Sequence, residues 1–290
     1  MANHQQKNYL VTGASTGIGY GIAAYLLKQG GRVLGSVRKE ADAQRVREQL
    51  GAQFHPLIFD VCDEPAIGRA AEEVQELLAG QGLAGLVNNA GIAVSGPMMH
   101  LPISEVQRQL DINVLGVLRV TKAFLPLLGA QKPAAFPPGR IVNISSVSGR
   151  IAAPFVGPYA ISKHGLEALT HSLRRELLIY GIDAISIQPG AVKTPIWGKA
   201  VEEIHTFPGT DYEPLLKEAQ ATIAATEKRA IEVERVAKVV WRALSARRPK
   251  TRYLIDANPL WYWLLFNIIP DRVMDGFMRR AFNKALRNRG

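Results

Sequence analysis

The chain has 290 residues, a formal net charge of +10 and hydrophobic residues at 47% of its positions. These values suit one large globular α/β unit and exclude an intrinsically disordered chain. The single cysteine, Cys62, excludes an intramolecular disulfide and a cysteine-based metal cluster, so no metal site is expected, and it fits a reducing, cytoplasmic location.

Short strand-like runs alternate with helical patterns along the chain. The expected strands are residues 9–11, 32–34, 54–59, 85–87, 140–145, 184–187 and 253–255. The expected helices are residues 19–28, 65–78, 104–128 and 159–180. This alternation predicts a doubly wound, Rossmann-type α/β fold, in which a parallel sheet carries helices on both faces. We expect a single domain over residues 1–256 and a C-terminal apolar and basic helical extension over residues 257–290.

The first expected strand runs directly into a glycine-rich turn and then a helix. In this context the glycines allow a tight turn and a close approach of the backbone to a pyrophosphate, which meets the positive end of the helix. A glycine cluster could also serve a purely steric role in a turn. We interpret the turn as a dinucleotide-binding loop, with cofactor-binding positions at Gly13, Ser15, Thr16, Gly17, Ile18 and Gly19.

The residues at the end of the second expected strand bear on the choice between the two nicotinamide cofactors. An acidic side chain there would bind the ribose hydroxyls, whereas an arginine accommodates a 2′-phosphate. Arg38 and Lys39 stand at this place, with no acid before Glu40. NADP(H) is therefore the expected cofactor, with both cations on its phosphate, and NAD(H) remains an alternative. The two cations could instead be ordinary surface residues.

Tyr159 and Lys163 lie four residues apart, on one face of an expected helix. An ammonium group near the phenol would favour the phenolate and lower the pKa of Tyr159. Tyr159 could then exchange a proton with a substrate oxygen, and Ser146, after the fifth expected strand, could hydrogen-bond the same oxygen. The spacing alone occurs by chance in many helices, so its meaning depends on the motifs around it.

Several motifs follow one another in a fixed order, and together they resemble those of the short-chain dehydrogenases/reductases. The resemblance extends over residues 7–195. The motifs are Thr12 to Gly19, Asp60-Val61, Asn88 to Gly91, Asn113, Ser146, Tyr159 with Lys163, and Pro189-Gly190 followed by Thr194.

The resemblance implies roles for these residues. Ser146, Tyr159, Lys163 and Asn113 would form the catalytic set, in which Asn113 holds a water that links Lys163 to solvent. Lys163 would also bind the nicotinamide ribose. The remaining cofactor contacts would be Asp60 and Val61 at the adenine, Asn89, Ala90 and Gly91 in the cofactor groove, and Pro189, Gly190, Val192 and Thr194 around the nicotinamide.

The segment after the Pro-Gly turn, about residues 195–227, is expected to close over the substrate as a lid. Apolar side chains from three parts of the chain suggest a pocket for a bulky alcohol or ketone. They are Trp197, Phe207 and Tyr212 in the lid, Phe155 before the catalytic tyrosine, and Met98 and Met99 after the fourth expected strand. Phe155 and Trp197 are the expected substrate contacts beside Ser146 and Tyr159, although each could equally be a packing residue.

Residues 259–270 form a dense aromatic and aliphatic run that is too short to cross a bilayer, and a basic segment follows it. Three interpretations compete, in this order: packing against the core or a second subunit, capping of the substrate cleft, and docking on a membrane surface. The tail also loosely resembles that of the steroid and retinol dehydrogenases of the family.

These expectations combine into an NADP(H)-dependent oxidoreductase that interconverts a lipophilic secondary alcohol and ketone, such as a steroid or retinoid, mainly by carbonyl reduction. The family resemblance also implies a homodimer or homotetramer. Two alternatives are a 3-oxoacyl-thioester reductase and a non-catalytic nicotinamide-binding sensor or scaffold. No nucleic-acid partner is expected, because the basic residues are dispersed outside the tail.

Overall fold

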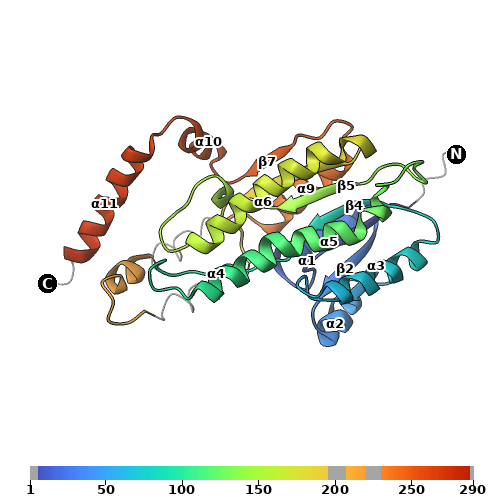
Figure 1. Ribbon diagram of the computed structural model, residues 1–290, viewed down its shortest axis with the longest axis horizontal. Helices are drawn as coiled ribbons and strands as arrows, with labels where there is room; N and C mark the ends of the chain where they lie inside the picture. Colours follow the sequence, from blue (N-terminus) through green and yellow to red (C-terminus); the bar gives the residue numbers. More distant parts are fainter. Residues whose placement is uncertain (1–5, 195–206, 220–229, 288–290) are drawn as a thin grey trace.

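The computed structural model describes residues 6–194, 207–219 and 230–287, and it confirms the doubly wound α/β fold. A parallel sheet of seven strands crosses the molecule in the order β3-β2-β1-β4-β5-β6-β7 (Figure 1). The strands are β1 (Asn8–Val11), β2 (Arg32–Val37), β3 (Phe54–Ile58), β4 (Leu83–Asn88), β5 (Arg140–Ile144), β6 (Asp183–Pro189) and β7 (Arg252–Ile255). All seven expected strands are present, with ends that differ from the expected ones by at most three residues.

Helices cover both faces of the sheet and create two cores. One face carries α1 (Gly17–Lys28), α2 (Glu40–Leu50) and α9 (Val233–Ser245), and the other carries α3 (Glu64–Leu78), α5 (Gly116–Phe124) and α6 (Gly157–Glu176). In β1, Tyr9 and Val11 enter the first core and Leu10 enters the second, as the alternation of side chains along a strand requires. The expected helices did not include α2 or α9. Helix α2 buries only Ala43 and Val46, so its apolar periodicity is weak.

The helix expected over residues 104–128 is divided into several parts. Helix α4 (Ile103–Leu110) passes into a π-helical turn, η1 (Asp111–Leu115), which leads into α5 and a 3-10 turn, η2 (Pro126–Leu128). Turns of the π type are rare and occur preferentially at functional sites. The turn contains Asn113, whose side chain is buried. The interruption therefore falls at a predicted catalytic residue.

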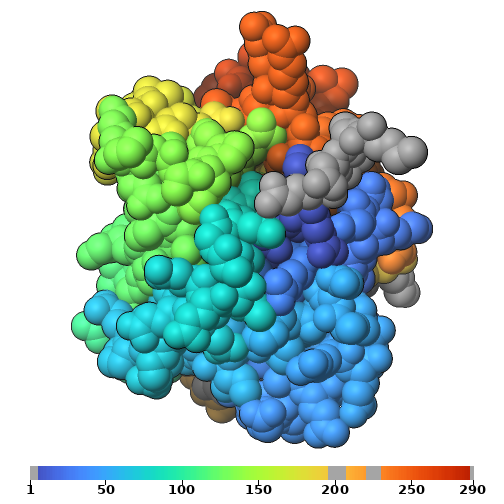
Figure 2. Space-filling view, turned by 90° about the vertical axis from the view of Figure 1, so that its right-hand side faces the viewer, coloured from blue at the N-terminus to red at the C-terminus, as the bar shows by residue number. Residues whose placement is uncertain are grey.

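The order of the strands also fixes where a ligand can bind. Strand β1 lies between β2 and β4, so the chain reverses its direction of winding across the sheet at this point. In open α/β sheets, ligands bind beyond the carboxyl ends of the strands at such a switch point. Figure 2 shows the end of the molecule that lies opposite the carboxyl ends of the strands. There α2 and α3 (blue to cyan) form the lower surface, below the green segment that leads into β5.

The C-terminal tail, which we define as α10 (Pro259–Asn267) and α11 (Asp271–Arg287), follows β7. In Figure 1, α11 stands away from the sheet at the left-hand end of the molecule. No residue of α10 is fully buried, and Tyr262, Leu264, Leu265 and Phe266 are half-buried, so the apolar run lies at the surface of the described chain and not inside its core. No helix within the described residues has the length and apolarity needed to cross a bilayer.

Candidate active site

The carboxyl end of β5 brings the three expected catalytic side chains together. Ser146 lies just beyond β5 and begins the 3-10 turn η3 (Val147–Gly149), where its Oγ accepts the Ser148 N–H at 3.0 Å. Tyr159 and Lys163 lie in the first turns of α6. Ser146 and Lys163 are each only 7% exposed, whereas Tyr159 is partly exposed. The first turns of α6 therefore face the end of β5 and form a largely buried polar site.

The Tyr159 hydroxyl shares a hydrogen bond with the Ser146 side chain. The Lys163 ammonium group is instead directed to a main-chain carbonyl. Lys163 Nζ donates to the carbonyl of Ile144 at 2.7 Å and lies 5.6 Å from the centroid of the Tyr159 ring. Burial raises the pKa of Tyr159 above its ordinary value, and the hydrogen bond with Ser146 offsets this only in part. The expectation that Lys163 lowers the Tyr159 pKa is therefore wrong for this arrangement, because a main-chain carbonyl holds the ammonium group. At neutral pH Tyr159 carries its proton.

Glu167, one turn beyond Lys163 on α6, is a buried acid that was not expected from the sequence motifs. Its carboxylate accepts hydrogen bonds from Ser186 Oγ and, at 3.2 Å, from Arg252 Nε. Burial opposes its ionisation, but the Ser186 hydrogen bond and the Arg252 charge together hold the pKa of Glu167 below its ordinary value. Burial lowers the pKa of Lys163 to about 8, and the Glu167 charge opposes this change. The four-residue spacing between Lys163 and Glu167 was the only sign in the sequence that the two side chains share a helix face. The burial of Glu167 could not be predicted from the sequence.

Asn113 ties the π-helical turn to the loop after β4. Its Oδ1 accepts the Ile92 N–H at 2.9 Å, and its Nδ2 donates to the Ile92 carbonyl at 3.0 Å and to Ser162 Oγ at 3.1 Å. Ser162 in turn donates to the carbonyl of Tyr159 at 2.8 Å. The Asn113 side chain thus supports the turn of α6 that carries Tyr159, a contact that the resemblance did not imply.

The glycine-rich turn between β1 and α1 is held in a compact shape. Thr12 Oγ1 accepts the N–H groups of Asn89 and Ala90 at 2.9 and 3.0 Å. The Asn89 amide donates to the carbonyls of Thr12 and Gly13 at 3.0 and 3.2 Å. A Cβ atom on Gly19 would overlap the Gly13 carbonyl and the Asn89 side chain, so the turn has no room for one. Such a turn at the N-terminus of a helix fits a dinucleotide pyrophosphate.

The end of β2 offers cations and no acid to this turn. Arg38 and Lys39 follow β2 and are exposed, and neither forms an ion pair with another described residue. Arg45, on α2, donates to the carbonyl of Ser15 at 3.0 Å and pairs with Asp42 at 2.6 Å. Arg45 therefore lies against the glycine-rich turn. Because α2 was not among the expected helices, this contact was not expected either.

The other predicted cofactor contacts lie at the carboxyl ends of three strands. Asp60 and Val61 follow β3, Asn89, Ala90 and Gly91 follow β4, and Pro189, Gly190, Val192 and Thr194 end or follow β6. These ends lie on the same edge of the parallel sheet as Ser146. Trp197, the expected substrate contact in the lid, lies outside the described residues.

An aromatic cluster, made of Phe155, Tyr212, His100 and Phe282, lies before the start of α6. The Phe155 ring packs edge-on against Tyr212, with centroids 5.9 Å apart, and stacks on Phe282 of α11 at 6.0 Å. Tyr212 also packs edge-on against His100 at 5.8 Å. Phe155 has a φ of 66°, which is unusual for a bulky residue, and its carbonyl accepts the Gly96 N–H at 2.7 Å. The cluster thus joins two of the expected walls, Phe155 and Tyr212 of the lid, and adds Phe282, which no local pattern indicates. In the third expected wall, Met98 and Met99 are 49% and 73% exposed.

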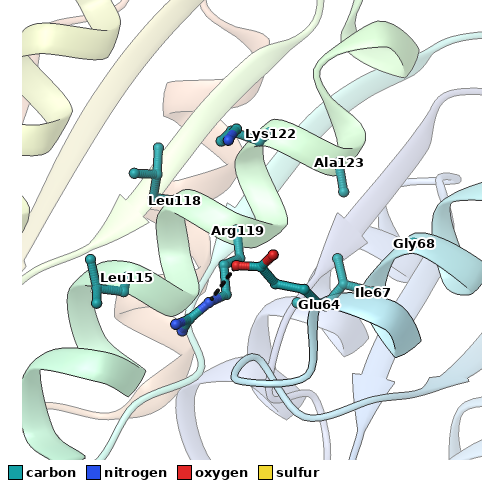
Figure 3. Close-up of a pocket in the computed structure, with 8 residues that line it drawn as sticks. All are labelled: Glu64, Ile67, Gly68, Leu115, Leu118, Arg119, Lys122 and Ala123. Carbon is teal, nitrogen blue, oxygen red and sulfur yellow. Dashed lines mark hydrogen bonds and ion pairs between the residues drawn. The ribbon is translucent and has the colours of Figure 1, made fainter.

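A separate pocket of about 420 Å³ lies between α3 and α5. Figure 3 shows Arg119 and Glu64 facing each other across it, in an ion pair of 3.1 Å, with Leu115 and Lys122 also at its wall. None of the predicted catalytic side chains lines this pocket. The active site is therefore identified by its converging side chains and not by this pocket.

Comparisons with known proteins agree with this geometry. Residues 7–205 match the family model described as short chain dehydrogenase. The chain is 40% identical to the NADPH-dependent 3-dehydrocapnine reductase of Ornithobacterium rhinotracheale, over 95% of this chain and 97% of that protein. It is 32% identical to retinol dehydrogenase 16 of Mus musculus, over 96% of this chain and 90% of that protein.

Solved structures show the same fold. A variant of actinorhodin polyketide ketoreductase, determined with NADPH, matches with a TM-score of 0.76 and 29% identity, over 89% of this chain and 99% of that chain. A short-chain dehydrogenase from Streptomyces avermitilis matches with a TM-score of 0.77 and 23% identity, over 99% of this chain and 100% of that chain. At that identity, the second likeness bears on the fold alone.

Proposed function

We propose that this chain, which belongs to the short-chain dehydrogenase family, uses NADPH to reduce a lipophilic ketone, with Tyr159 as the proton donor. Members of this family are oxidoreductases, and the proposal adds the cofactor, the substrate class and the roles of the residues. The meeting of Ser146, Tyr159 and Lys163 beyond β5 carries the proposal.

NADP(H) is the cofactor that the chain's own residues favour. The glycine-rich turn would hold the pyrophosphate, and Arg38, directly after β2, would bind the 2′-phosphate. Lys39, exposed beside it, would add a second positive charge. The name of the 40% identical relative includes NADPH dependence, and the ketoreductase structure was determined with NADPH.

The protonation states favour reduction of a carbonyl group. When bound, the reduced nicotinamide supplies the hydride that the carbonyl carbon receives. Tyr159 holds its proton at neutral pH and would donate it to the carbonyl oxygen, while Ser146 would hydrogen-bond the same oxygen. Lys163 would return a proton to the Tyr159 oxygen. Asn113, through Ser162, would keep the first turn of α6 in place.

A lipophilic substrate fits the entrance to this site. Phe155 and Tyr212 present aromatic surface, and Phe282 extends that surface from the tail. Apolar and aromatic walls with a few polar groups are typical of pockets for small lipophilic ligands. Relatives named retinol dehydrogenase and 3-dehydrocapnine reductase support a lipophilic alcohol or ketone.

We also propose that the protein forms a homodimer or homotetramer. Leu115 of η1 and Ile161 of α6 are apolar side chains that are 47% and 45% exposed, on helices that pack against each other. Burial of exposed apolar groups favours association of copies. Light scattering should give a mass of at least two chains, and a monomer at micromolar concentration would contradict this.

The activity is tested by crossing NADPH and NADH with retinoid, steroid, aliphatic and acyl-thioester carbonyl compounds. We expect the fastest turnover with NADPH and a retinoid or steroid ketone. Tyr159→Phe should lower kcat by roughly 10²–10⁴-fold while cofactor binding, followed by nicotinamide fluorescence, stays intact. Tyr180→Phe, in the 3-10 turn Leu177–Tyr180 that follows α6, is the matched control and should keep its activity. Full activity in Tyr159→Phe would remove this residue from the mechanism.

The cofactor assignment has a test of its own. Arg38→Asp places an acid where the ribose hydroxyls would lie and removes the cation proposed for the phosphate. We expect the ratio of kcat/KM for NADPH to that for NADH to fall by at least about tenfold. Arg47→Asp, an exposed arginine of α2, makes the same change of charge and should leave the ratio unchanged. An equal effect of both substitutions would show a general effect of charge and contradict the role of Arg38.

A further inference from the structure

The C-terminal tail presents large apolar side chains to solvent. Leu260, Trp261 and Trp263 of α10 are 65%, 48% and 52% exposed, and Ile268, directly after α10, is 61% exposed. In α11, Phe277 is 53% exposed. Large exposed apolar side chains concentrated in one short segment favour interaction with a protein or a membrane.

Helix α11 is amphipathic and basic. Its apolar residues recur as adjacent pairs every four residues, at 273–274, 277–278, 281–282 and 285–286. Outside these pairs the helix carries five cations, Arg272, Arg279, Arg280, Lys284 and Arg287, against two acids, Asp271 and Asp275. A basic face beside an apolar stripe is typical of helices that lie in the interface of a membrane.

The tail touches the rest of the described chain near the entrance to the active site. Phe282 stacks on Phe155 at 6.0 Å, and the guanidinium of Arg150 lies 4.9 Å from the centroid of the Phe266 ring. Phe155 belongs to the aromatic cluster before α6. The exposed apolar surface of the tail and the proposed substrate entrance therefore adjoin each other.

We propose that α10 and α11 dock the protein on a membrane surface that contains anionic lipid. Trp261 and Trp263 would lie among the headgroups, and Arg279 and Arg280 would contact their negative charge. Helix α10 has nine residues and is about 14 Å long, less than half of the hydrocarbon thickness, so it fits an orientation along the interface.

Charge favours anionic lipid over a second copy of the chain as the occupant of this surface. The chain carries a net charge of +10, and a contact between two tails would bring like charges together. Anionic headgroups neutralise the same cations and accept the tryptophan side chains at the interface. This inference rests on the proposed function in one respect, because a lipophilic ketone dissolved in the membrane would reach the site beside Phe155.

Co-sedimentation of the full chain with vesicles tests the docking. We expect binding to vesicles of phosphatidylcholine with phosphatidylserine, little binding to phosphatidylcholine alone, and a decrease as salt concentration rises. Arg279→Glu with Arg280→Glu should weaken binding by more than about tenfold. Arg247→Glu with Arg248→Glu, at an exposed site between α9 and β7, makes the same change of charge and should have a much smaller effect.

A second variant tests the apolar contribution. Trp261→Ser with Trp263→Ser should also weaken binding to the mixed vesicles, with an unchanged unfolding temperature because both side chains are exposed. Equal loss of vesicle binding in the two arginine variants, or unchanged binding in the tryptophan variant, would overturn the proposal.

A decrease of molecular mass in the tail variants, without any vesicle binding by the wild-type chain, would assign the tail to self-association. Reduction of a water-soluble ketone is measured in parallel, so that loss of docking and loss of activity are distinguished.

Discussion

Glu167 lies one helical turn beyond Lys163 on α6, and the two side chains are 6% and 7% exposed. Burial lowers the pKa of Lys163 to about 8, and the negative charge of Glu167 limits this fall. The protonation of Lys163 is therefore set by a balance between burial and one neighbouring acid.

The rate of reduction should depend on pH through Lys163. Below a pH of about 8 the side chain is an ammonium group that can return a proton to Tyr159, and above it the proton is lost. We expect kcat/KM for the cofactor, which reports titrations of the free enzyme, to fall as pH rises through this value. Because Glu167 raises the pKa of Lys163, Glu167→Gln should move the fall to lower pH.

The control for this shift is Glu176→Gln, an exposed acid at the end of the same helix, which should leave the pH profile unchanged. Thermal unfolding establishes that both variants are folded at the assay temperature. A folded Glu167→Gln enzyme with the wild-type midpoint would contradict the coupling between the two residues.

Asn113→Ala should reduce both stability and turnover. The substitution leaves the partly buried N–H of Ile92 without its side-chain partner, at a cost of about 1–3 kcal/mol in the free energy of unfolding, while the Ile92 carbonyl keeps its bond from Gln109. It also removes the contact to Ser162, so kcat should fall more than KM rises. Urea unfolding and steady-state kinetics measure the two effects.

Gln109→Ala is the comparison variant. Gln109 bonds the Val94 N–H and the Ile92 carbonyl at 2.6 and 2.8 Å in the same loop, and its bond to Ser162 Oγ, at 3.5 Å, is longer than that of Asn113, at 3.1 Å. We expect a similar loss of stability with a smaller loss of kcat. If both variants lost the same kcat when fully folded, the role of Asn113 would be limited to stability.

Gly19→Ala should weaken cofactor binding strongly. The added methyl group would overlap the Gly13 carbonyl and the Asn89 side chain, so the glycine-rich turn would have to move. We expect the Kd for NADPH to rise by at least about tenfold, measured by fluorescence titration. Gly68→Ala, in α3, meets no atom within 4 Å and should bind NADPH normally, with a gain of about 0.5–1 kcal/mol in stability. Wild-type affinity in Gly19→Ala would exclude this turn as the pyrophosphate site.

Phe282→Ala should affect bulky substrates selectively. The ring stacks on Phe155, and an aromatic pair contributes about 0.5–1.5 kcal/mol beyond its buried area. Without vesicles, KM for a retinoid or steroid ketone should rise by about two- to tenfold, while KM for a small ketone stays constant. Phe277→Ala, at an exposed position on the same helix, is the control. Equal changes in KM for large and small ketones would show that Phe282 does not contribute to the binding of bulky substrates.

Local patterns predicted much of the fold. Strands buried on both faces, such as β1 with Tyr9, Leu10 and Val11, give short apolar runs that the sequence displays directly. The polar helix α2 was not predicted, because it buries only Ala43 and Val46 and so has little apolar periodicity. The π-helical turn was not predicted either, because Asn113 bonds Ile92, a residue 21 positions away.

The sequence by itself determined the parallel sheet and the glycine-rich turn, because periodicity and motif spacing are properties of neighbouring positions, and its resemblance to the short-chain dehydrogenases implied the candidate catalytic residues. Tertiary structure alone decided which atoms meet. It directed Lys163 to the Ile144 carbonyl, buried Glu167 beside it, and raised the pKa of Tyr159 that its spacing to Lys163 had been expected to lower. Desolvation depends on every element packed around a group, and no local pattern contains that information.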